Sequence, residues 1–395
     1  MRNSFIVFIC ITGFLLFINS CNGSSNKNLQ HSEELMNIIF DHYSVEGTNL
    51  LRETYPFNIQ HKATYLATED RSEQANQYSY LWPYSGSLTA VCALLEATSN
   101  ESKYLQMLDS TVLPGLEKYY DTRRQPSAYA SYINTAPMSD RFYDDNIWLG
   151  IDFTDLYILT GVQRFLDKAL EISRFIESGE DALLGGGIYW CEQKKNGKNT
   201  CSNAPGSVFA LKLFEATKDS NYFYKGKELY EWTKLNLQDK NDFLYYDNKN
   251  LNGHVDKTKF AYNSGQMLQY AALLYQLTND SKYLIEAQNI AASAYEYFFH
   301  EFQSEDGKEF KLLNKGNIWF TAVMFRGYIE LYQIDTNKTY LDAFQANLDR
   351  AWIHMRDAEN GLFNSDWSAK EKDDSKWLLT QFAMDEMYAR LSTIK

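Results

Sequence analysis

Apolar residues recur every three or four positions through most of the chain, in segments that short polar turns separate. This spacing places the apolar side chains along one face of an α-helix. The pattern predicts twelve helices, over residues 32–52, 80–98, 102–120, 143–160, 163–178, 204–217, 220–236, 261–278, 281–299, 316–335, 338–355 and 375–392. We therefore expect an all-α protein.

The helices repeat in pairs. The second helix of five successive pairs opens with an aromatic residue, at intervals of 57 to 61 residues: Tyr104, Phe165, Phe223, Tyr283 and Tyr340. Such an interval accommodates two helices and two connections, so it indicates six helix hairpins. Every second helix, beginning with 80–98, is the more uniformly apolar and is expected to lie inside, with the others around it. The arrangement predicted is an (α/α)6 barrel. An open solenoid of hairpins is the alternative, disfavoured because the count stops at six pairs and no polar capping repeat is evident.

In such a barrel the inner helices run in the same direction, so the segments that lead into them meet at one mouth. These segments are rich in Trp, Tyr, Asn, Gly and Asp: 81–87, 141–148, 200–207, 260–266, 314–320 and 373–377. The turns at the other end are short and polar. We therefore expect a functional site at the mouth.

Charge and composition narrow the choice of ligand. A formal net charge of −13 without a basic stripe excludes nucleic acid as a partner and disfavours acidic polysaccharides. A mouth rich in Trp and Tyr, interleaved with amides and carboxyls, suits a neutral sugar. Five cysteines and six histidines show no metal-ligand spacing, so no metal or cofactor is expected. We expect a monomer.

The N-terminus has the pattern of a secreted lipoprotein. Arg2 and an apolar run over residues 5–18 predict a signal peptide over residues 1–20, followed by a lipidated Cys21. An uncleaved anchor with an incidental cysteine is the alternative. Residues 21–32 are predicted to be a flexible tether, and residues 33–395 one catalytic domain. The absence of acidic residues directly after Cys21 favours the periplasmic face of a Gram-negative outer membrane over the cell surface. Cys191 and Cys201 form either a disulfide or two free thiols.

Two adjacent aspartates, Asp144 and Asp145, precede an apolar stretch in the segment "RFYDDNIWLG". Adjacent Cα atoms are about 3.8 Å apart, which suits the carboxyl separation of about 5–5.5 Å in retaining glycosidases better than the roughly 6.5–9.5 Å of inverting ones. Like charges this close also keep one carboxyl protonated. The alternative is that the pair only caps a helix. Asp373 and Asp374 also precede a helix and are interpreted as such a cap.

Four motifs in order resemble glycoside hydrolase family 76, the α-1,6-mannanases: "YDDNIWLGIDFTDLYILTG", "GGGIYW", "KNTCSNAPGSVFALKLFEAT" and "YNSGQMLQYAALLYQLTND". The segment "LWPYSGSLTAVCALLEATSN" is similar to that family's first inner helix, and the resemblance runs from about residue 33 to 392. It implies a metal-free retaining hydrolase in which Asp144 is the nucleophile and Asp145 the general acid/base.

The resemblance also implies that Asp247 and Tyr262 touch the sugar beside the cleaved bond. Further substrate contacts are expected from mouth residues: Trp82, Tyr189, Trp190, Asn203 and Asn263. The run Gly185–Gly187 is either a close approach to substrate or a plain turn. Two other functions stay open, namely a mannan transglycosylase that uses the same intermediate and a non-catalytic glycan-binding lipoprotein. Endo or exo action and the source of the mannoside are also open.

Overall fold

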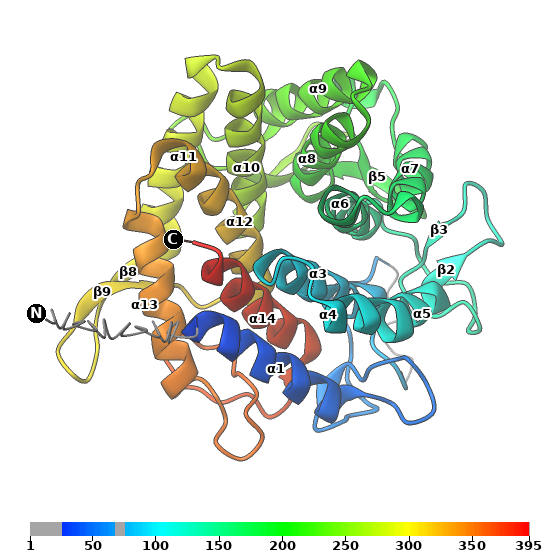
Figure 1. The fold of residues 1–395 in the computed structure, drawn as a ribbon. Coiled ribbons are helices and arrows are strands. Elements are labelled where there is room, and N and C mark those ends of the chain that lie inside the picture. Colours follow the sequence, from blue (N-terminus) through cyan, green and yellow to red (C-terminus); the bar gives the residue numbers. More distant parts are fainter. Residues whose placement is uncertain (1–25, 68–75, 395) are drawn as a thin grey trace, which may run out of the picture.

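Six inner helices surrounded by six outer ones make up the body of the molecule in the computed structural model, which describes residues 26–67 and 76–394 (Figure 1). The inner helices are α3 (Leu81–Ala97), α6 (Tyr143–Thr160), α8 (Thr200–Thr217), α10 (Ala261–Thr278), α12 (Ile318–Asp335) and α14 (Leu378–Ser392). The last inner helix, α14, packs against the first, α3, so the ring closes. The fold is the predicted (α/α)6 barrel and not an open solenoid.

The outer helices follow the inner ones in the chain, except that α1 (Lys27–Tyr43) precedes α3. They are α7 (Gln163–Glu177), α9 (Ser220–Leu237), α11 (Ser281–Phe298), α13 (Thr339–His354) and an irregular helix that combines α4 (Ser102–Met107), a π-helical turn (Leu108–Val112), α5 (Leu113–Leu116) and a 3₁₀ turn (Glu117–Tyr119). Buried residues cover nearly all of each inner helix but only one face of each outer helix. The inner and outer assignment made from hydrophobicity is therefore correct.

Four of the five turns from inner to outer helices share one conformation, which explains the repeat in the sequence; the turn after α3 differs. Gly161, Lys218, Asn279 and Thr336 each follow an inner helix in the left-handed conformation, and each backbone N–H bonds a carbonyl of the last helical turn. Close approach of the inner helices needs glycine. A Cβ at Gly265 on α10 would lie 2.3 Å from the Cα of Met324 on α12.

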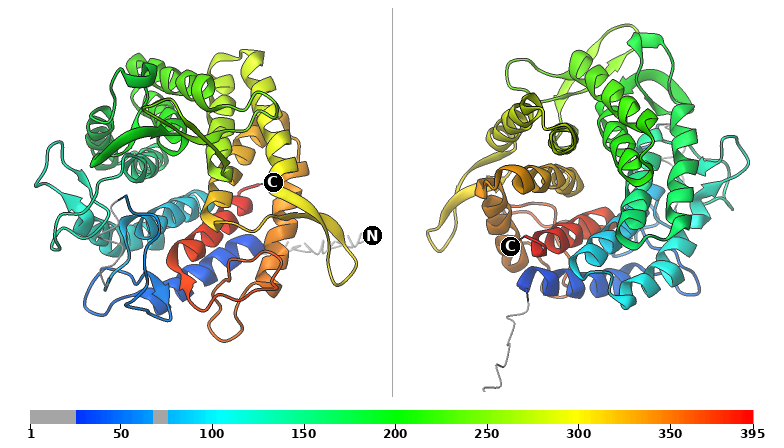
Figure 2. Two further views of the ribbon diagram at one scale, coloured as in Figure 1. Left: turned by 180° about the vertical axis from the view of Figure 1, so that it is seen from behind. Right: turned by 45° about the horizontal axis from the view of Figure 1, so that its top comes forward.

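Short antiparallel strands, which the all-helical pattern did not predict, lie outside the ring. The largest sheet has the order β4-β5-β6-β7, with strands Tyr189–Cys191, Lys194–Asn199, Tyr246–Asn250 and Val255–Lys259. The hairpin of β8 (Phe299–Gln303) and β9 (Glu309–Leu313) projects from the body (Figures 1 and 2). The remaining pairs are β1 (Thr54–Tyr55) with β10 (Lys376–Trp377) and β2 (Tyr120–Asp121) with β3 (Ala128–Tyr129).

Three predicted boundaries are wrong. The tether was predicted to end at residue 32, but α1 begins at Lys27, where the Asn26 side chain accepts a hydrogen bond from the backbone N–H of Asn28. The same helix ends at Tyr43 and not at residue 52. Helix α8 begins at Thr200, four residues before the predicted start, because Pro205 is tolerated inside it. The predicted signal peptide and Cys21 lie outside the described residues.

Two further observations concern the cysteines and the helices. Cys92, Cys191 and Cys201 are buried free thiols. Cys191 and Cys201 therefore do not form the disulfide that was one of the two alternatives. No helix within residues 26–67 and 76–394 has the length and apolar character needed to cross a bilayer.

Candidate active site

A cavity of about 510 Å³ opens where the N-termini of the inner helices converge, as the sequence predicted. Five inner helices contribute side chains to its wall: Trp82, Asp144, Asp145, Trp148, Cys201, Tyr262, Trp319 and Phe320. The strands β4, β5 and β6 and the segment 64–66 complete the rim. Seen from behind, the strands lie across this end of the ring (Figure 2).

The aspartate pair lies in the first turn of α6, facing the cavity. The N-cap position of α6 is Phe142, so neither Asp144 nor Asp145 is the capping residue. Both carboxyls stand near the positive end of the helix dipole, which favours their ionised forms. The geometry therefore supports the chemical interpretation of the pair over the capping one.

The two carboxyls have unequal surroundings. Asp144 Oδ2 accepts a hydrogen bond from the indole Nε1 of Trp190 (3.1 Å), and its Oδ1 accepts one from the backbone N–H of Asp145 (3.1 Å). The thiol of Cys201 also donates to Asp144. Within the described part of the chain, no hydrogen bond reaches the Asp145 carboxyl.

These surroundings order the protonation of the pair. Burial raises the pKa of both carboxyls above the ordinary value of an aspartate. The hydrogen bonds to Asp144 partly offset this, whereas the negative charge of Asp144 raises the pKa of Asp145 further. Asp144 therefore ionises first, and Asp145 keeps its proton.

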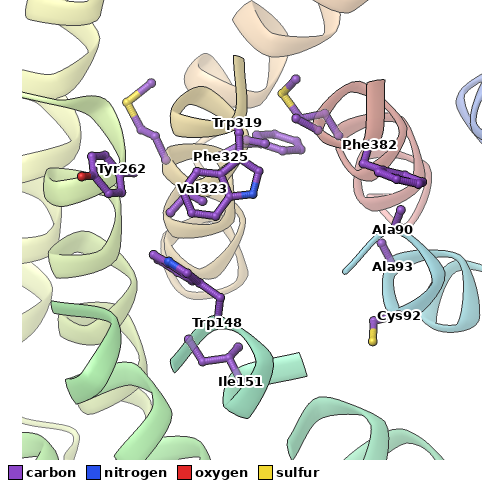
Figure 3. Packing of buried hydrophobic residues seen from close by; sticks show 14 of the residues in the cluster. Ala90, Cys92, Ala93, Trp148, Ile151, Tyr262, Trp319, Val323, Phe325 and Phe382 are labelled. Atoms are coloured by element: carbon purple, nitrogen blue, oxygen red, sulfur yellow. The ribbon is translucent and has the colours of Figure 1, made fainter. Parts of the chain in front are cut away.

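Aromatic rings form the floor and one side of the cavity. The ring of Trp319 meets Trp148 edge-on at 5.0 Å and Trp82 edge-on at 5.3 Å. Tyr262 stacks on Phe320 at 4.0 Å with an interplanar angle of 12°. Figure 3 shows Trp148, Trp319 and Tyr262 between α6, α12 and α10. Flat apolar faces beside carboxyls are the surface that a pyranose ring requires.

A further carboxyl, Asp247 on β6, also lines the cavity. Its Oδ2 accepts a hydrogen bond from Asn248 Nδ2 at 2.8 Å. Burial raises its pKa above the ordinary value. Of the predicted substrate contacts, Trp82, Trp190, Asp247 and Tyr262 thus reach the cavity.

Three predicted substrate contacts lie behind the cavity wall instead. Asn203 is fully buried and joins α8 to the start of β4, accepting from the Ile188 N–H (2.7 Å) and donating to its carbonyl (2.9 Å). The Tyr189 hydroxyl donates to Asp181 at 2.6 Å. Asn263 is fully buried on α10. Asn203 and Tyr189 sit in mouth segments but face the protein interior, whereas the Asn263 side chain contacts the cavity indirectly, through its polar interaction with Asp247.

Two other sequence interpretations resolve as structural features. The run Gly185–Gly187 is a packing turn, because Gly187 has a φ of +84° and a Cβ there would lie 2.8 Å from the Trp232 ring. Asp373 does not cap α14, whose N-cap position is Trp377. Its carboxyl instead accepts from the backbone N–H and the hydroxyl of Ser365, at 2.7 and 2.9 Å.

The rim contains residues that the sequence pattern did not single out. Lys194, Asn196 and Gly197 of β5 line the cavity, as do residues 64–66. The buried Glu53 carboxylate fixes part of this rim by accepting from the Tyr65 hydroxyl (2.6 Å) and from Trp377 Nε1 (2.7 Å). These segments are polar and lack helical periodicity, so no pattern in the sequence marks them.

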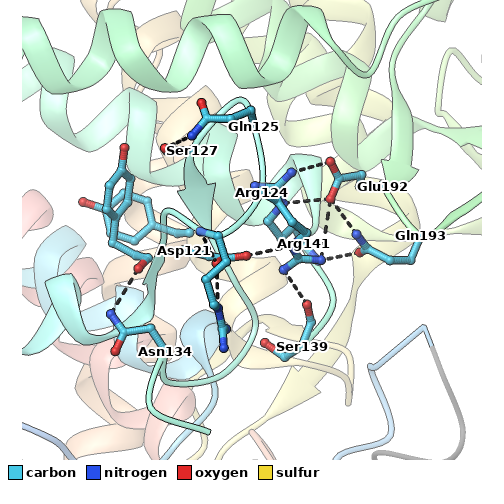
Figure 4. A network of polar contacts seen from close by, with 12 residues as sticks. Asp121, Arg124, Gln125, Ser127, Asn134, Ser139, Arg141, Glu192 and Gln193 are labelled. Atoms are coloured by element: carbon cyan, nitrogen blue, oxygen red, sulfur yellow. Dashed lines mark hydrogen bonds and ion pairs between the residues drawn. The ribbon is translucent and has the colours of Figure 1, made fainter. Parts of the chain in front are cut away.

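An ion pair joins the strand that carries Trp190 to the helix that carries Asp144 (Figure 4). The Arg141 guanidinium is fully buried, and its Nε donates to Glu192 at 2.7 Å. The Glu192 backbone N–H also bonds the Arg141 carbonyl at 3.0 Å. Arg141 is three residues before Asp144, and Glu192 is two after Trp190. The pair, which we call the Arg141–Glu192 clamp, therefore fixes β4 against the start of α6.

Sequence and structure comparisons identify the relatives of this chain. The sequence profile of glycosyl hydrolase family 76 matches residues 52–393. A comparison with curated proteins gives no match.

Among solved structures, the family 76 glycoside hydrolase (mannosidase) Bt3792 from Bacteroides thetaiotaomicron is 31% identical, with a TM-score of 0.84 over 92% of this chain and 98% of that chain. The GH76 α-mannanase BT2949 of Bacteroides thetaiotaomicron is 25% identical, with a TM-score of 0.79 over 92% of this chain and 95% of that one. The α-1,6-mannanase GH76A of Salegentibacter sp. HEL1_6 in complex with α-1,6-mannotriose shares the fold at 22% identity, with a TM-score of 0.73 over 92% of this chain and 99% of that one.

The matched family profile covers most of the chain, and the solved family 76 structures share its fold. The chain belongs to glycoside hydrolase family 76.

Proposed function

We propose that this enzyme hydrolyses α-1,6-mannosidic bonds in mannan or manno-oligosaccharides with retention of anomeric configuration. The observation that carries the proposal is the pair of adjacent carboxyls, one hydrogen-bonded and one not, in a cavity floored by tryptophans. The Salegentibacter α-1,6-mannanase supports it, since variants of that protein with two consecutive aspartates replaced are described as inactive and bind α-1,6-manno-oligosaccharides.

The two aspartates take different roles in a double displacement. Asp145 keeps its proton because it is buried beside the negative Asp144, so it acts as the acid that protonates the departing glycosidic oxygen. Asp144 is stabilised as a carboxylate by Trp190 Nε1 and the Asp145 N–H, and it attacks the anomeric carbon. In the second step Asp145, now a carboxylate, removes a proton from the water that releases the sugar from Asp144.

Product analysis tests the reaction. The chain from residue 26 onward is incubated with unbranched α-1,6-mannan and with short α-1,6-manno-oligosaccharides, and the products are separated by size. Oligosaccharides shorter than the substrate, released first as the α-anomer in NMR spectra, are the expected result. Products longer than a short substrate indicate transglycosylation. Absence of any product despite binding supports the glycan-binding alternative.

Substitutions separate the two roles. Asp144→Asn and Asp145→Asn are each expected to lower kcat on mannan by at least about a thousandfold. With an α-mannosyl fluoride, whose leaving group needs no proton, Asp145→Asn regains formation of the glycosyl-enzyme whereas Asp144→Asn does not. Asp342→Asn is the matched control, because Asp342 also lies in the first turn of a helix, α13, but on the surface. It is expected to leave kcat unchanged.

We also propose that residues 1–20 are a lipoprotein signal and that a lipidated Cys21 anchors the enzyme to the periplasmic face of the outer membrane. The support is the sequence pattern of Arg2, the apolar run 5–18 and the cysteine. Metabolic labelling with an alkyne fatty acid is expected to label the wild type but not Cys21→Ala. Digestion of the protein by protease added to intact cells contradicts the periplasmic assignment.

A further inference from the structure

A second cavity, of about 520 Å³, lies beside the catalytic cavity at the same end of the barrel. The starts of α10 and α12, the end of α11 and the loop after β9 form its wall, at the base of the projecting β8–β9 hairpin. We call it the Tyr297 pocket. Its volume matches that of the catalytic cavity, so it has room for a ligand of similar size.

The two cavities share two aromatic side chains in their walls. Phe260 and Phe320 line both of them, and their rings meet at 5.4 Å. The ring of Phe320 also stacks on Tyr262 of the catalytic cavity. An extended ligand that leaves the catalytic cavity across this wall therefore enters the Tyr297 pocket directly.

The side chains of the Tyr297 pocket suit a sugar. Tyr297 is 49% exposed, and no described residue hydrogen-bonds its hydroxyl. Asn317 uses its Oδ1 to accept from the Trp319 N–H at 2.9 Å, which leaves its amide donors for a ligand. Lys259 Nζ lies over the Tyr297 ring at 5.6 Å, and the half of the side chain that stays exposed, with its hydroxyl and the Asn317 amide, offers stacking and hydrogen bonds to a pyranose.

The charges around the pocket are compensated, which favours a neutral ligand over an anionic one. Lys259 Nζ pairs with Asp239 at 2.7 Å and with Asp242 at 2.6 Å. Lys315 pairs with Glu371. Neither lysine therefore presents an uncompensated positive charge to a phosphate or sulfate group.

We propose that the Tyr297 pocket binds mannose residues of the substrate chain beyond those held in the catalytic cavity. This inference rests on the proposed function and adds that the enzyme favours long α-1,6-mannan chains over short ones. The chain crosses the wall of Phe260 and Phe320, and one of its sugar rings stacks on Tyr297.

Kinetics on substrates of two lengths test the proposal. With unbranched α-1,6-mannan, Tyr297→Ala is expected to lower kcat/KM about three- to tenfold through loss of ring stacking. With the shortest oligosaccharide that the wild type cleaves, it is expected to leave kcat/KM unchanged. Tyr297→Phe keeps the ring and loses only the hydroxyl, so on the long substrate its kcat/KM is expected to lie between those of the wild type and Tyr297→Ala, with no change on the short one. Tyr224→Ala, at an exposed tyrosine on the outer helix α9, is the matched control.

A binding measurement gives a readout independent of turnover. Calorimetric titration of Asp144→Asn with α-1,6-manno-oligosaccharides of increasing length is expected to show affinity rising with length, and the gain is expected to vanish when Tyr297→Ala is added. Equal effects of Tyr297→Ala on long and short substrates, or no effect on either, overturn the inference. Failure of the wild type to cleave any α-1,6-mannoside refutes the proposed function instead.

Discussion

Two chemically identical side chains, Asp144 and Asp145, differ in their surroundings: among the described residues, hydrogen-bond donors reach the carboxyl of Asp144 but not that of Asp145, which instead faces the charge of Asp144. Two side chains donate to Asp144 and can be replaced without touching the pair, namely the Cys201 thiol and the indole of Trp190, whose Nε1 donates at 3.1 Å. A hydrogen bond to a charged group contributes about 1.5–3 kcal/mol. The Trp190 indole therefore helps to hold the pKa of Asp144 below the value that burial alone would give.

Replacing Trp190 tests this contribution. Trp190→Phe removes the donor but keeps an aromatic ring, so the carboxylate of Asp144 loses stabilisation and its pKa rises. Because Asp144 must be ionised to attack, activity is lost at a higher pH on the acid side, while the alkaline side, where Asp145 loses its proton, moves little. We expect kcat/KM at acid pH to fall about tenfold or more. The measurement is the pH profile of kcat/KM, and an unchanged acid limb contradicts the role of Trp190.

The same electrostatics predict that Asp145 lowers the stability of the fold. Its pKa is raised in the folded state, so the folded form keeps a proton that the unfolded form releases above about pH 4. Stability therefore falls as pH rises through the window between the unfolded and folded pKa. At pH 7 the variant Asp145→Asn is expected to be more stable than the wild type, with a free energy of unfolding about 0.5–2 kcal/mol higher. Urea denaturation at pH 7 and pH 4 measures this, and the difference is expected to vanish at pH 4. A less stable variant at pH 7 contradicts the argument.

At single positions, the sequence located the mouth but not the direction of each side chain. Trp82, Trp190, Asp247 and Tyr262 reach the cavity. Asn203 does not, because α8 begins earlier than predicted and turns this residue toward β4. Whether a residue lies in the loop before a helix or in its first turn decides where its side chain points, and composition carries no information on that boundary.

Among the secondary-structure elements, the link between β4 and α6 decides the geometry of the site. The Arg141–Glu192 clamp is the charged part of this link, and the guanidinium has no access to solvent. Weakening it should displace β4 and with it Trp190, although neither residue touches the catalytic pair.

Glu192→Gln tests the clamp. The substitution keeps the shape of the side chain but leaves the buried guanidinium without a compensating charge, so we expect a loss of about 1–3 kcal/mol in the free energy of unfolding. The acid limb of the pH profile should also move toward higher pH, in the same direction as in Trp190→Phe. Glu101→Gln is the control, since its pair with Lys103 is half exposed at both ends, and it should change stability by less than about 1 kcal/mol. A destabilised Glu192→Gln with an unchanged pH profile assigns the clamp a purely structural role.

Helices and strands differed in how well the sequence predicted them. The helices carry long apolar faces, so their periodicity located nearly all of them. Strand β5 reads "KKNGKN", which has no apolar face, because it lies on a rim and not on a core. Its hydrogen bonds to β4 and β6 specify it instead. The pairing with β4 contains an irregularity in register, and β6 is about fifty residues further along the chain. A local pattern of apolar and polar residues does not reveal either pairing.

For the whole molecule, closure of the ring depends on its first helix. Helix α1 packs against α14, and the Ser32 hydroxyl donates to the fully buried Asp385 at 2.5 Å. The residues matched by the family profile begin at 52, after this helix. A domain boundary taken from that match alone therefore omits part of the outer ring.

Truncation at two positions tests the dependence. A chain that begins at residue 26 is expected to unfold like the full-length protein. A chain that begins at residue 45 loses four buried apolar side chains, Leu35, Met36, Ile39 and Tyr43. At about 1.5–3 kcal/mol each they contribute about 6–12 kcal/mol, which is comparable with the whole stability of a typical domain, about 5–15 kcal/mol. The shorter chain also leaves the buried Asp385 of α14 without Ser32, its hydrogen-bond partner on α1. We expect it to lack a cooperative thermal transition and activity, and retention of both contradicts the role of α1 in closing the barrel.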